Sequence, residues 1–315
     1  MTPSLARLGL AVATVAAALV IAAAPARADD TITVGMYAPT APFDSTGDRN
    51  TFIKALADHL AGATDGATVK GRVYGSAGAF ATAIKKGEIQ FALVDAPYAA
   101  ALGLPYRILA AAVRDGDATV AWQVVASSKL KRLSDLAGKR LAVPAIGAKQ
   151  NAFVTNALLG GEVEASYFGK IVEAADAHSA VTLISVGKAD AALVPGGIDL
   201  PAGVSRVLDL RQVGWPMLVA APGVDAALAQ KIATRARSFK GTGAFTGFTS
   251  ADAGKYKALA GSFGKPRRRG PMAVPPPARL AVRDLLAGRV FDVPLSDVLS
   301  LVETPPPVPA PAPAP

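Results

Sequence analysis

The sequence contains no cysteine and only two histidines among its 315 residues. The absence of cysteine excludes disulfides, thiolate metal ligands, cysteine nucleophiles and a lipid anchor attached to cysteine. Aromatic residues make up only 6% and charged residues 18%, whereas hydrophobic residues reach 51%. Most of the chain can therefore bury a core, and its length suffices for two domains. We expect neither a metal site nor a bound cofactor.

The charge balance is basic, with 33 Lys and Arg against 24 Asp and Glu and a formal net charge of +9. Such a balance is compatible with nucleic acid, an anionic membrane or an anionic ligand. The basic residues are scattered singly apart from one cluster at 265–269, and no zinc spacing, basic helix or aromatic-basic interleaving accompanies them. We therefore predict no nucleic-acid partner. The cluster is interpreted as solvated charge, with docking to an anionic partner as the alternative.

The first 28 residues have the features of a secretory signal peptide. Arg7 supplies a positive charge, residues 8–24 form an uncharged apolar run, and Ala26-Arg27-Ala28 matches a small-residue cleavage site. The alternative is an uncleaved membrane anchor, but the run is short and rich in alanine. We predict cleavage after residue 28 and, without a lipid-attachment cysteine, a protein located in the periplasm.

Two stretches of the chain, 75–97 and 176–195, resemble each other. Aligning Ile84 with Ile184, 100 residues further on, also aligns a glycine and an Ala-Leu-Val segment. Each stretch predicts a turn of small residues, a short amphipathic helix, a glycine C-cap and a buried strand. Two similar units indicate two similar lobes, each with its own sheet.

Strand and helix patterns alternate over most of the remaining chain. The predicted strands cover 31–37, 67–74, 91–94, 107–113, 119–126, 140–144, 163–168, 204–210 and 215–221. The predicted helices outside the repeat cover 49–60, 98–103, 133–138, 151–159, 225–240, 279–286 and 296–302. The order strand–helix–strand–helix–strand favours an α/β fold with parallel strands.

The C-terminal part differs in composition. Residues 255–277 are turn-rich and basic, and residues 303–315 are rich in proline and alanine. A proline-rich segment favours an extended polyproline conformation and cannot bury a core. We predict a C-terminal extension made of a basic loop with short helices, 266–302, and a spacer-like tail, 303–315.

Four motifs carry a family resemblance. The most specific is Leu-Ser-Asp-Leu-Ala-Gly-Lys-Arg-Leu-Ala at 133–142, followed by the Asp-Ala-His-Ser turn at 176–179 and the turns Gly-Glu-Ile-Gln-Phe-Ala at 87–92 and Gly-Lys-Ala-Asp-Ala-Ala at 187–192. Together they resemble periplasmic substrate-binding proteins of ABC transporters. The resemblance is closest to the phosphonate-binding branch of the type II periplasmic-binding fold, which is related to sulfonate-binding proteins and transferrins. It covers about residues 32–263.

This resemblance implies two Rossmann-like α/β lobes joined by two crossover strands, with the ligand in the cleft between them. The crossovers would be 119–126 and 215–221. Lobe one would then comprise 30–122 and 218–265, and lobe two would comprise 123–217. The resemblance also implies a small-molecule ligand and an inner-membrane ABC permease as partners. We expect a monomer.

Candidate ligand-binding residues follow from the predicted topology. Open α/β sheets bind ligands outside the carboxyl ends of their strands, and helix N-termini bind anions through free amides. The residues in such loops are Thr40, Phe43, Ser76, Asp95, Tyr98, Ser127, Lys149, Gln150, Asn151, Asp176, His178 and Ser179. Simple helix capping is the alternative for Ser76, Asp176 and Ser179. For His178 the alternative is a packed turn residue.

The turn at 147–151 departs from the phosphonate-binding relatives. There a Ser/Thr-rich turn grips the phosphonate with hydroxyls and amides, whereas here the turn reads Gly-Ala-Lys-Gln-Asn. The missing hydroxyls argue against phosphonate itself. Lys149, Gln150 and Asn151 suit a carboxylate or another polar ligand.

We expect a binding protein and not an enzyme. The chain has no cysteine, few histidines, no nucleophile-elbow motif and no metal spacing. Relatives of this fold that synthesise thiamine precursors or condense pyrroles are cytoplasmic, which does not suit an exported chain. The sequence predicts an exported solute-binding protein that captures a small anionic or polar ligand by hinge closure and delivers it to an ABC-type permease. The alternative is a periplasmic sensor or scaffold protein with the same fold.

Overall fold

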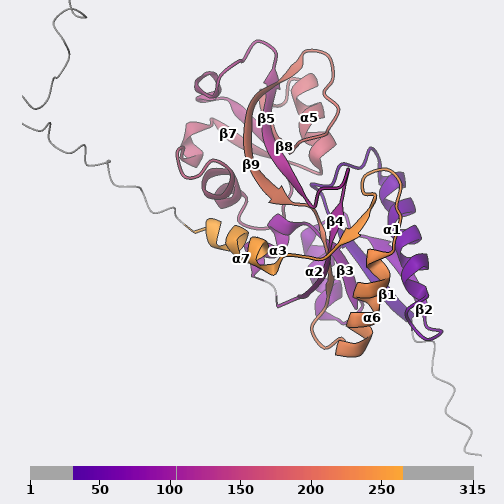
Figure 1. The fold of residues 1–315 in the computed structure, drawn as a ribbon. Coiled ribbons are helices and arrows are strands. Elements are labelled where there is room, and N and C mark those ends of the chain that lie inside the picture. The colour runs from indigo at the N-terminus through magenta and orange to yellow at the C-terminus, as the bar shows by residue number, and fades with distance from the viewer. Residues whose placement is uncertain (1–30, 104, 265–315) are drawn as a thin grey trace, which may run out of the picture. The chain divides into compact units, whose positions relative to one another are not determined.

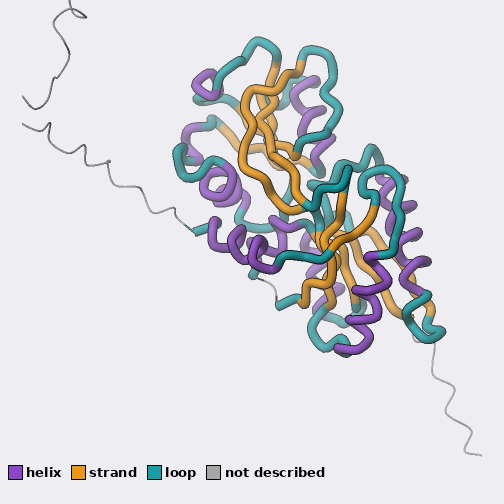
Figure 2. The backbone as a smooth tube through the Cα atoms, viewed as in Figure 1, coloured by secondary structure: helices purple, strands orange, loops and turns teal. Residues whose placement is uncertain are grey.

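The computed structural model describes residues 31–103 and 105–264. The predicted signal peptide, basic cluster, two C-terminal helices and proline-rich tail lie outside the described residues. Within them the chain forms two sheets with helices packed on their faces (Figures 1 and 2). No helix in the described ranges is long and apolar enough to cross a membrane.

The first sheet has six strands in the order β11-β4-β10-β3-β1-β2. They are β1 (Thr31–Tyr37), β2 (Thr68–Val73), β3 (Phe91–Val94), β4 (Arg107–Val113), β10 (Met217–Ala220) and β11 (Gly247–Thr249). Strand β1 pairs parallel with β2 and β3, whereas β10 runs antiparallel to β3 and β4. We call this sheet lobe one, together with its helices α1 (Thr46–Ala61), α2 (Ala77–Lys85), α3 (Ala96–Leu102) and α6 (Ala226–Arg237).

The second sheet has five strands in the order β7-β6-β8-β5-β9. They are β5 (Thr119–Ser127), β6 (Arg140–Pro144), β7 (Lys170–Ala174), β8 (Ala191–Pro195) and β9 (Val204–Gly214). With α5 (Ala177–Ser185), the short α4 (Gln150–Ala152) and the π-helical segment Phe153–Leu158 it forms lobe two. The sequence pattern predicts an ordinary helix where α4 and this π-helical segment lie.

The internal repeat forms the same unit in both lobes. Helix α2 leads into β3 in lobe one, and α5 leads into β8 in lobe two. Gly87 and Gly187 follow the two helices with φ of 71° and 66°, a conformation that glycine adopts without strain. Each unit buries one apolar helix face against its own sheet, with Phe80 and Val181 among the buried residues.

The chain crosses between the lobes twice. It leaves lobe one between β4 and β5 and returns between β9 and β10. Arg114 and Asp117 exchange backbone hydrogen bonds of 3.0 and 2.9 Å around a tight turn, and the Trp215 amide donates to the Ala118 carbonyl at 2.9 Å. We call these crossing segments, 114–118 and 214–216, the hinge. Two α/β lobes with two connections confirm the predicted fold class.

The sheet membership of β5 differs from the lobe limits drawn from the sequence. Strand β5 pairs with β9 from its first residue, Thr119 opposite Gly214, so all of it belongs to the second sheet. The crossing therefore precedes β5, whereas the sequence placed it within 119–126. The long β5–β9 ladder explains why this segment looks like one continuous strand.

Two sequence predictions are wrong. Residues 163–168 form no strand; a 3-10 turn covers Ala165–Tyr167, and the strand follows as β7. Just before β7 the chain passes close to the preceding turn, because a Cβ at Gly169 would lie 2.3 Å from the Gly138 carbonyl oxygen. Residues 253–262, predicted as turn-rich from 255 onward, form helix α7 (Ala253–Ser262).

Helix α7 forms despite two glycines because its N-cap and its buried face favour it. Asp252 caps it by accepting from the amides of Gly254 and Lys255. The Tyr256 hydroxyl donates to the Trp215 carbonyl in the hinge, and the helix also contacts α3 of lobe one. Phe263, directly after the helix, stacks on Phe153 of lobe two with ring centroids 5.8 Å apart. The last described helix therefore packs along the hinge.

Candidate functional site

The loops at the carboxyl ends of the parallel strands meet between the two lobes. The Tyr37 hydroxyl at the end of β1 donates to the Ala145 carbonyl after β6 at 2.8 Å. Beside it, the amide of Ala177 at the start of α5 donates to the Pro39 carbonyl at 3.1 Å. Strand order brings these loops together, because both sheets direct their parallel carboxyl ends to this junction.

An ion pair links the lobes at the same place. Arg49 of α1 and Asp176, the N-cap of α5, lie 2.7 Å apart, with side chains only 15% and 20% exposed. Asp176 also accepts from the Ser179 amide at 2.7 Å. Burial alone would raise the pKa of Asp176, but the Ser179 amide and the Arg49 guanidinium together hold it below its ordinary value.

A second carboxyl group lies buried behind the ion pair. Asp95 follows β3, is fully buried, and its Oδ2 accepts from the Thr40 amide at 2.7 Å. Burial raises the pKa of Asp95 to about 7, although the Thr40 hydrogen bond and the charge of Arg49 oppose the rise. Within the described part of the chain, Asp95 Oδ1, Arg49 Nε and the Tyr98 hydroxyl are buried without a hydrogen-bond partner.

Direct packing closes the middle of the junction. Gly147 of lobe two has φ of 84°, and a Cβ there would lie 2.6 Å from the Ala77 Cβ and 2.9 Å from the Tyr98 ring of lobe one. Tyr98 in turn packs edge-on against Tyr37, with ring centroids 4.9 Å apart. A side chain at position 147 would therefore push the lobes apart.

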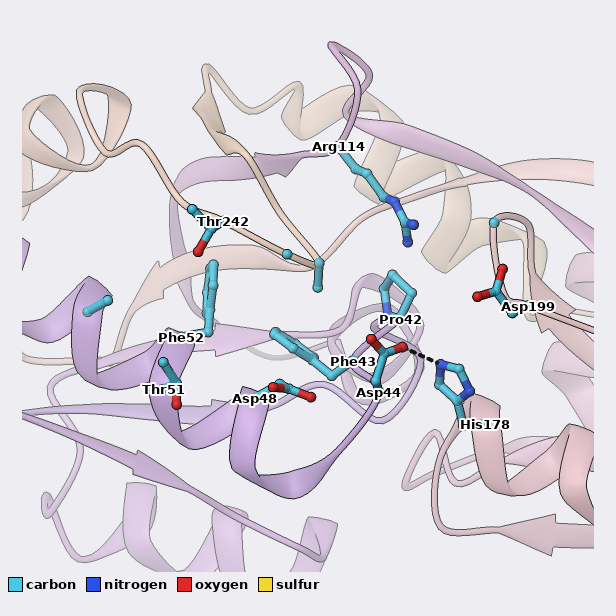
Figure 3. Close-up of a pocket in the computed structure, with 14 residues that line it drawn as sticks. Pro42, Phe43, Asp44, Asp48, Thr51, Phe52, Arg114, His178, Asp199 and Thr242 are labelled. Carbon is cyan, nitrogen blue, oxygen red and sulfur yellow. Dashed lines mark ion pairs between the residues drawn. The ribbon is translucent and has the colours of Figure 1, made fainter.

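Two cavities flank this central contact. The first, here the Ser76 pocket, has a volume of about 460 Å³ and is lined by Tyr37, Ser76, Gly147, Lys149 and Glu173, among others. The second, here the Arg114 pocket, has a volume of about 380 Å³. Figure 3 shows its polar side chains, which include Asp44, Asp48, Arg114, His178, Asp199 and Thr242. His178 Nε2 of lobe two and Asp44 Oδ1 of lobe one lie 3.3 Å apart across it.

Most of the predicted site residues lie at this junction. Ser76, Lys149 and Gln150 line the Ser76 pocket, and Phe43 and His178 line the Arg114 pocket. The contact between the lobes, which separates the two pockets, is made or supported by Thr40, Asp95, Tyr98, Asp176 and Ser179. The capping alternative holds for Ser76 and Asp176, whose side chains cap α2 and α5, but not for Ser179, which donates to the cap.

Three predicted residues do not direct their side chains freely into either cavity. Gln150 braces its own loop, because its Nε2 donates to the Pro144 carbonyl at 2.8 Å and its Oε1 accepts from the Ile146 amide at 3.2 Å. Phe43 packs largely into the core, 3% exposed and edge-on to Phe52 at 5.4 Å. Asn151 is exposed on α4 and lines neither pocket.

Ser127 lies at the opposite end of lobe two. Strand β5 runs antiparallel to β8, with Trp122 opposite Pro195 and Ala126 opposite Ala191. The carboxyl end of β5 therefore points away from the carboxyl end of β8 and from the junction. The rule for strand ends applies to parallel strands, and the sequence alone did not show that β5 is antiparallel.

Sequence reasoning missed Tyr37, Arg49, Arg114 and Asp199. Arg49 reads as an ordinary residue of an amphipathic helix, and nothing in the sequence pairs it with Asp176, 127 residues away. Arg114 could have been found, because it lies between the predicted strand 107–113 and Asp115-Gly116. This pair is typical of a two-residue hairpin turn, with φ of 52° and 88° here, and it marks Arg114 as the residue at the strand end.

Solved structures of periplasmic binding proteins share this fold. PhnD1 from Prochlorococcus marinus in complex with methylphosphonate superposes with a TM-score of 0.60 at 13% identity, covering 76% of this chain and 100% of that chain. A Xanthomonas citri protein bound to chloride superposes with a TM-score of 0.61 at 14% identity, covering 76% of this chain and 99% of that chain. A binding protein component of an ABC phosphonate transporter from Pseudomonas aeruginosa gives 0.56 at 11% identity, covering 73% and 84%. The fold is that of a type II periplasmic binding protein.

Sequence comparison gives the family. The family model described as ABC transporter, phosphonate, periplasmic substrate-binding protein matches residues 40–256. The chain therefore belongs to this family of periplasmic substrate-binding proteins, as the motifs predict; it is a family of transport proteins and not of enzymes. No curated protein sequence matches the chain significantly.

Proposed function

We propose that this protein is exported, captures a small polar or anionic solute between its two lobes by hinge closure, and delivers it to an ABC permease. The lobes would rotate about the hinge, where only two short segments join them. Family membership supports transport, and the position of the cavities supports capture between the lobes.

One observation carries the proposal: buried polar atoms without partners lie at the junction of the lobes. Unpaired buried polar groups are rare in folded proteins because each costs about 1–3 kcal/mol. Asp95 Oδ1, Arg49 Nε and the Tyr98 hydroxyl are such groups. A junction that opens exposes them to water or solute, so they suit a moving interface better than a permanent core.

The ligand-facing residues would lie on both sides of the central contact. Ser76 at the start of α2 and the exposed Lys149 both line the Ser76 pocket, and His178 contributes to the Arg114 pocket. The turn at 147–151 has no hydroxyl, and Gly147 packs on lobe one. Both features make a phosphonate cradle at this turn unfavourable.

Distance measurements between the lobes test the proposal. Because the chain lacks cysteine, Lys70→Cys in β2 and Lys188→Cys after α5 place one label on each lobe, both at exposed positions. A bound solute should narrow the inter-lobe distance distribution and raise the melting temperature. At a hundredfold excess over Kd the linkage gain is about 2.7 kcal/mol, or several degrees.

Solutes of different charge should be tested one by one in parallel: phosphate, methylphosphonate, sulfonates, carboxylates and amino acids. If none raises the melting temperature and none changes the inter-lobe distance, solute capture is disproved and the sensor or scaffold function gains support. For transport, cells lacking the gene should lose uptake of the solute that binds. Retained uptake would contradict delivery to a permease.

A further inference from the structure

Arg114 lies in the hinge with its guanidinium group directed into the Arg114 pocket. The tight turn at 114–117 fixes its backbone through two hydrogen bonds. Its side chain points from this turn toward Pro42, Asp44, His178 and Asp199 (Figure 3). The guanidinium lies over Gly197 of lobe two, where a Cβ would be 3.6 Å from Arg114 Cζ.

The guanidinium of Arg114 has unused hydrogen-bonding capacity. Its Nη1 is buried and has no partner among the described residues. Its Nε forms an ion pair with Asp115 at 3.7 Å, and the Asp115 side chain is 85% exposed, so this contact is weak. A buried N–H of a charged group without an acceptor is costly, and an acceptor entering the pocket would remove that cost.

The acidic side chains that line the pocket are three aspartates. Asp44 and Asp48 come from lobe one and Asp199 from lobe two, opposite the single guanidinium. His178, 3.3 Å from Asp44, is held at the acidic side. The pocket thus offers an oxyanion receptor at the hinge and carboxylates on both walls.

We infer that the Arg114 pocket binds a small amino acid-type zwitterion, with its carboxylate on Arg114 and its ammonium group between the carboxylates of Asp44 and Asp199. This inference rests on the proposed function, because it names the solute class captured between the lobes. The ammonium group contacts a residue from each lobe, so the bound ligand links them. The volume of about 380 Å³ accommodates such a molecule.

The pocket favours a carboxylate over a phosphonate. A carboxylate carries one negative charge and matches the planar fork of one guanidinium. A phosphonate carries up to two charges and needs several donors. Here three aspartates line the pocket and would repel the second charge.

Titration calorimetry on the full-length mature protein tests the inference with matched probes. The probes are the proteinogenic amino acids, β-alanine and γ-aminobutyrate. Their deaminated counterparts, propionate and butyrate, lack the ammonium group, and ethylamine lacks the carboxylate. Aminoethylphosphonate differs from β-alanine in the oxyanion alone. At least one amino acid should bind at least roughly tenfold more tightly than its deaminated acid and than aminoethylphosphonate, because each comparison removes or replaces one charged contact.

Two variants place the ligand in this pocket. Arg114→Gln should weaken binding of that amino acid roughly 30-fold, and Asp199→Asn should weaken it roughly fivefold. Arg206→Gln and Asp209→Asn are the matched controls, because this exposed pair on β9 lines neither inter-lobe pocket, and they should leave Kd unchanged. Arg114→Lys keeps the positive charge but lacks the planar guanidinium, so its Kd should lie between those of the parent and of Arg114→Gln. Such an intermediate Kd would not be expected if the substitutions acted only by disrupting folding.

The outcomes separate this inference from the proposed function. Tighter binding of aminoethylphosphonate or of a simple acid, or a Kd unchanged by Arg114→Gln, overturns the inference while solute capture stands. If no probe of any charge binds and the lobes do not move, both are overturned. Selective amino acid binding that requires Arg114 supports both.

Discussion

The two copies of the internal repeat place their carboxyl groups at different ends. With an offset of 100 residues, Ser76 corresponds to Asp176 at the start of the helix, and Asp95 corresponds to Pro195 at the end of the strand. Lobe one thus has a neutral helix cap and an acidic strand end, whereas lobe two has an acidic helix cap and a neutral strand end. The residues that build the sheets match, and the residues at the junction differ.

Both carboxyl groups depend on Arg49, but their pKa values shift in opposite directions. Asp176 pairs with Arg49 directly and remains partly solvated, so its pKa is lowered. Asp95 is fully buried and has one hydrogen bond, so burial raises its pKa to about 7. From these shifts we expect the Asp176 carboxylate, with a cation at 2.7 Å, to stabilise the junction, and the buried Asp95 carboxyl group to destabilise it when charged.

The largest predicted effect is the pH dependence caused by Asp95. Its folded pKa lies above its unfolded value, so the folded state binds the proton more tightly and stability falls as pH rises. Between about pH 4 and pH 7 the contribution of this group should fall by up to about 4 kcal/mol. Urea unfolding of the parent and of Asp95→Asn at several pH values across this range measures the effect. The difference between their free energies of unfolding should change with pH.

Asp176 should give the opposite sign below this range, in urea unfolding of the parent and of Asp176→Asn extended to lower pH. Its lowered pKa means that its contribution is complete above about pH 4 and is lost as pH falls further. Asp58→Asn, at an exposed position of α1, controls for general charge effects. A constant difference between parent and Asp95→Asn across the range would show that Asp95 titrates normally and is reached by water.

The next largest effect should follow from removing the shared cation. Arg49→Met leaves Asp176 without its partner at the nearly closed junction and should cost about 3 kcal/mol in the free energy of unfolding. Lys54→Met on the same helix removes an exposed pair with Asp58 and should change nothing measurable. Equal, small effects of both substitutions would mean that the Arg49–Asp176 contact is no stronger than a surface pair.

Local sequence pattern was enough to predict that some of the candidate residues lie at the junction between the lobes. Ser76, Asp95, Asp176 and His178 follow strand ends or precede helices, and parallel β strands bring such positions together. Ser127 was misplaced because direction within a sheet depends on pairing partners far away in the sequence, here Trp122 with Pro195.

The charge partners and the close contacts between the lobes could not be predicted from the sequence either, because they also join residues that are far apart in the chain. Arg49 and Asp176 come from different lobes, and the contact of Gly147 with Ala77 depends on how the lobes meet. The fold was easier to predict than the site, because hydrophobic periodicity is local. Whether the cap of a helix is paired across the junction, as Asp176 is with Arg49, depends on a single contact between residues far apart in the sequence.

The smallest predicted effect concerns the neutral cap. Ser76→Ala removes the 3.3 Å hydrogen bond that Ser76 Oγ accepts from the Ala79 amide and should cost about 1 kcal/mol in urea unfolding. Ser76→Asp keeps a cap and makes lobe one resemble lobe two, so stability should stay within about 0.5 kcal/mol of the parent. The new carboxylate would lie in the Ser76 pocket, which both Lys149 and Glu173 line, so it would have one cation and one anion in the same cavity. If Ser76→Ala costs nothing, its hydroxyl does not stabilise α2, and contact with a solute becomes the better reason for a serine there.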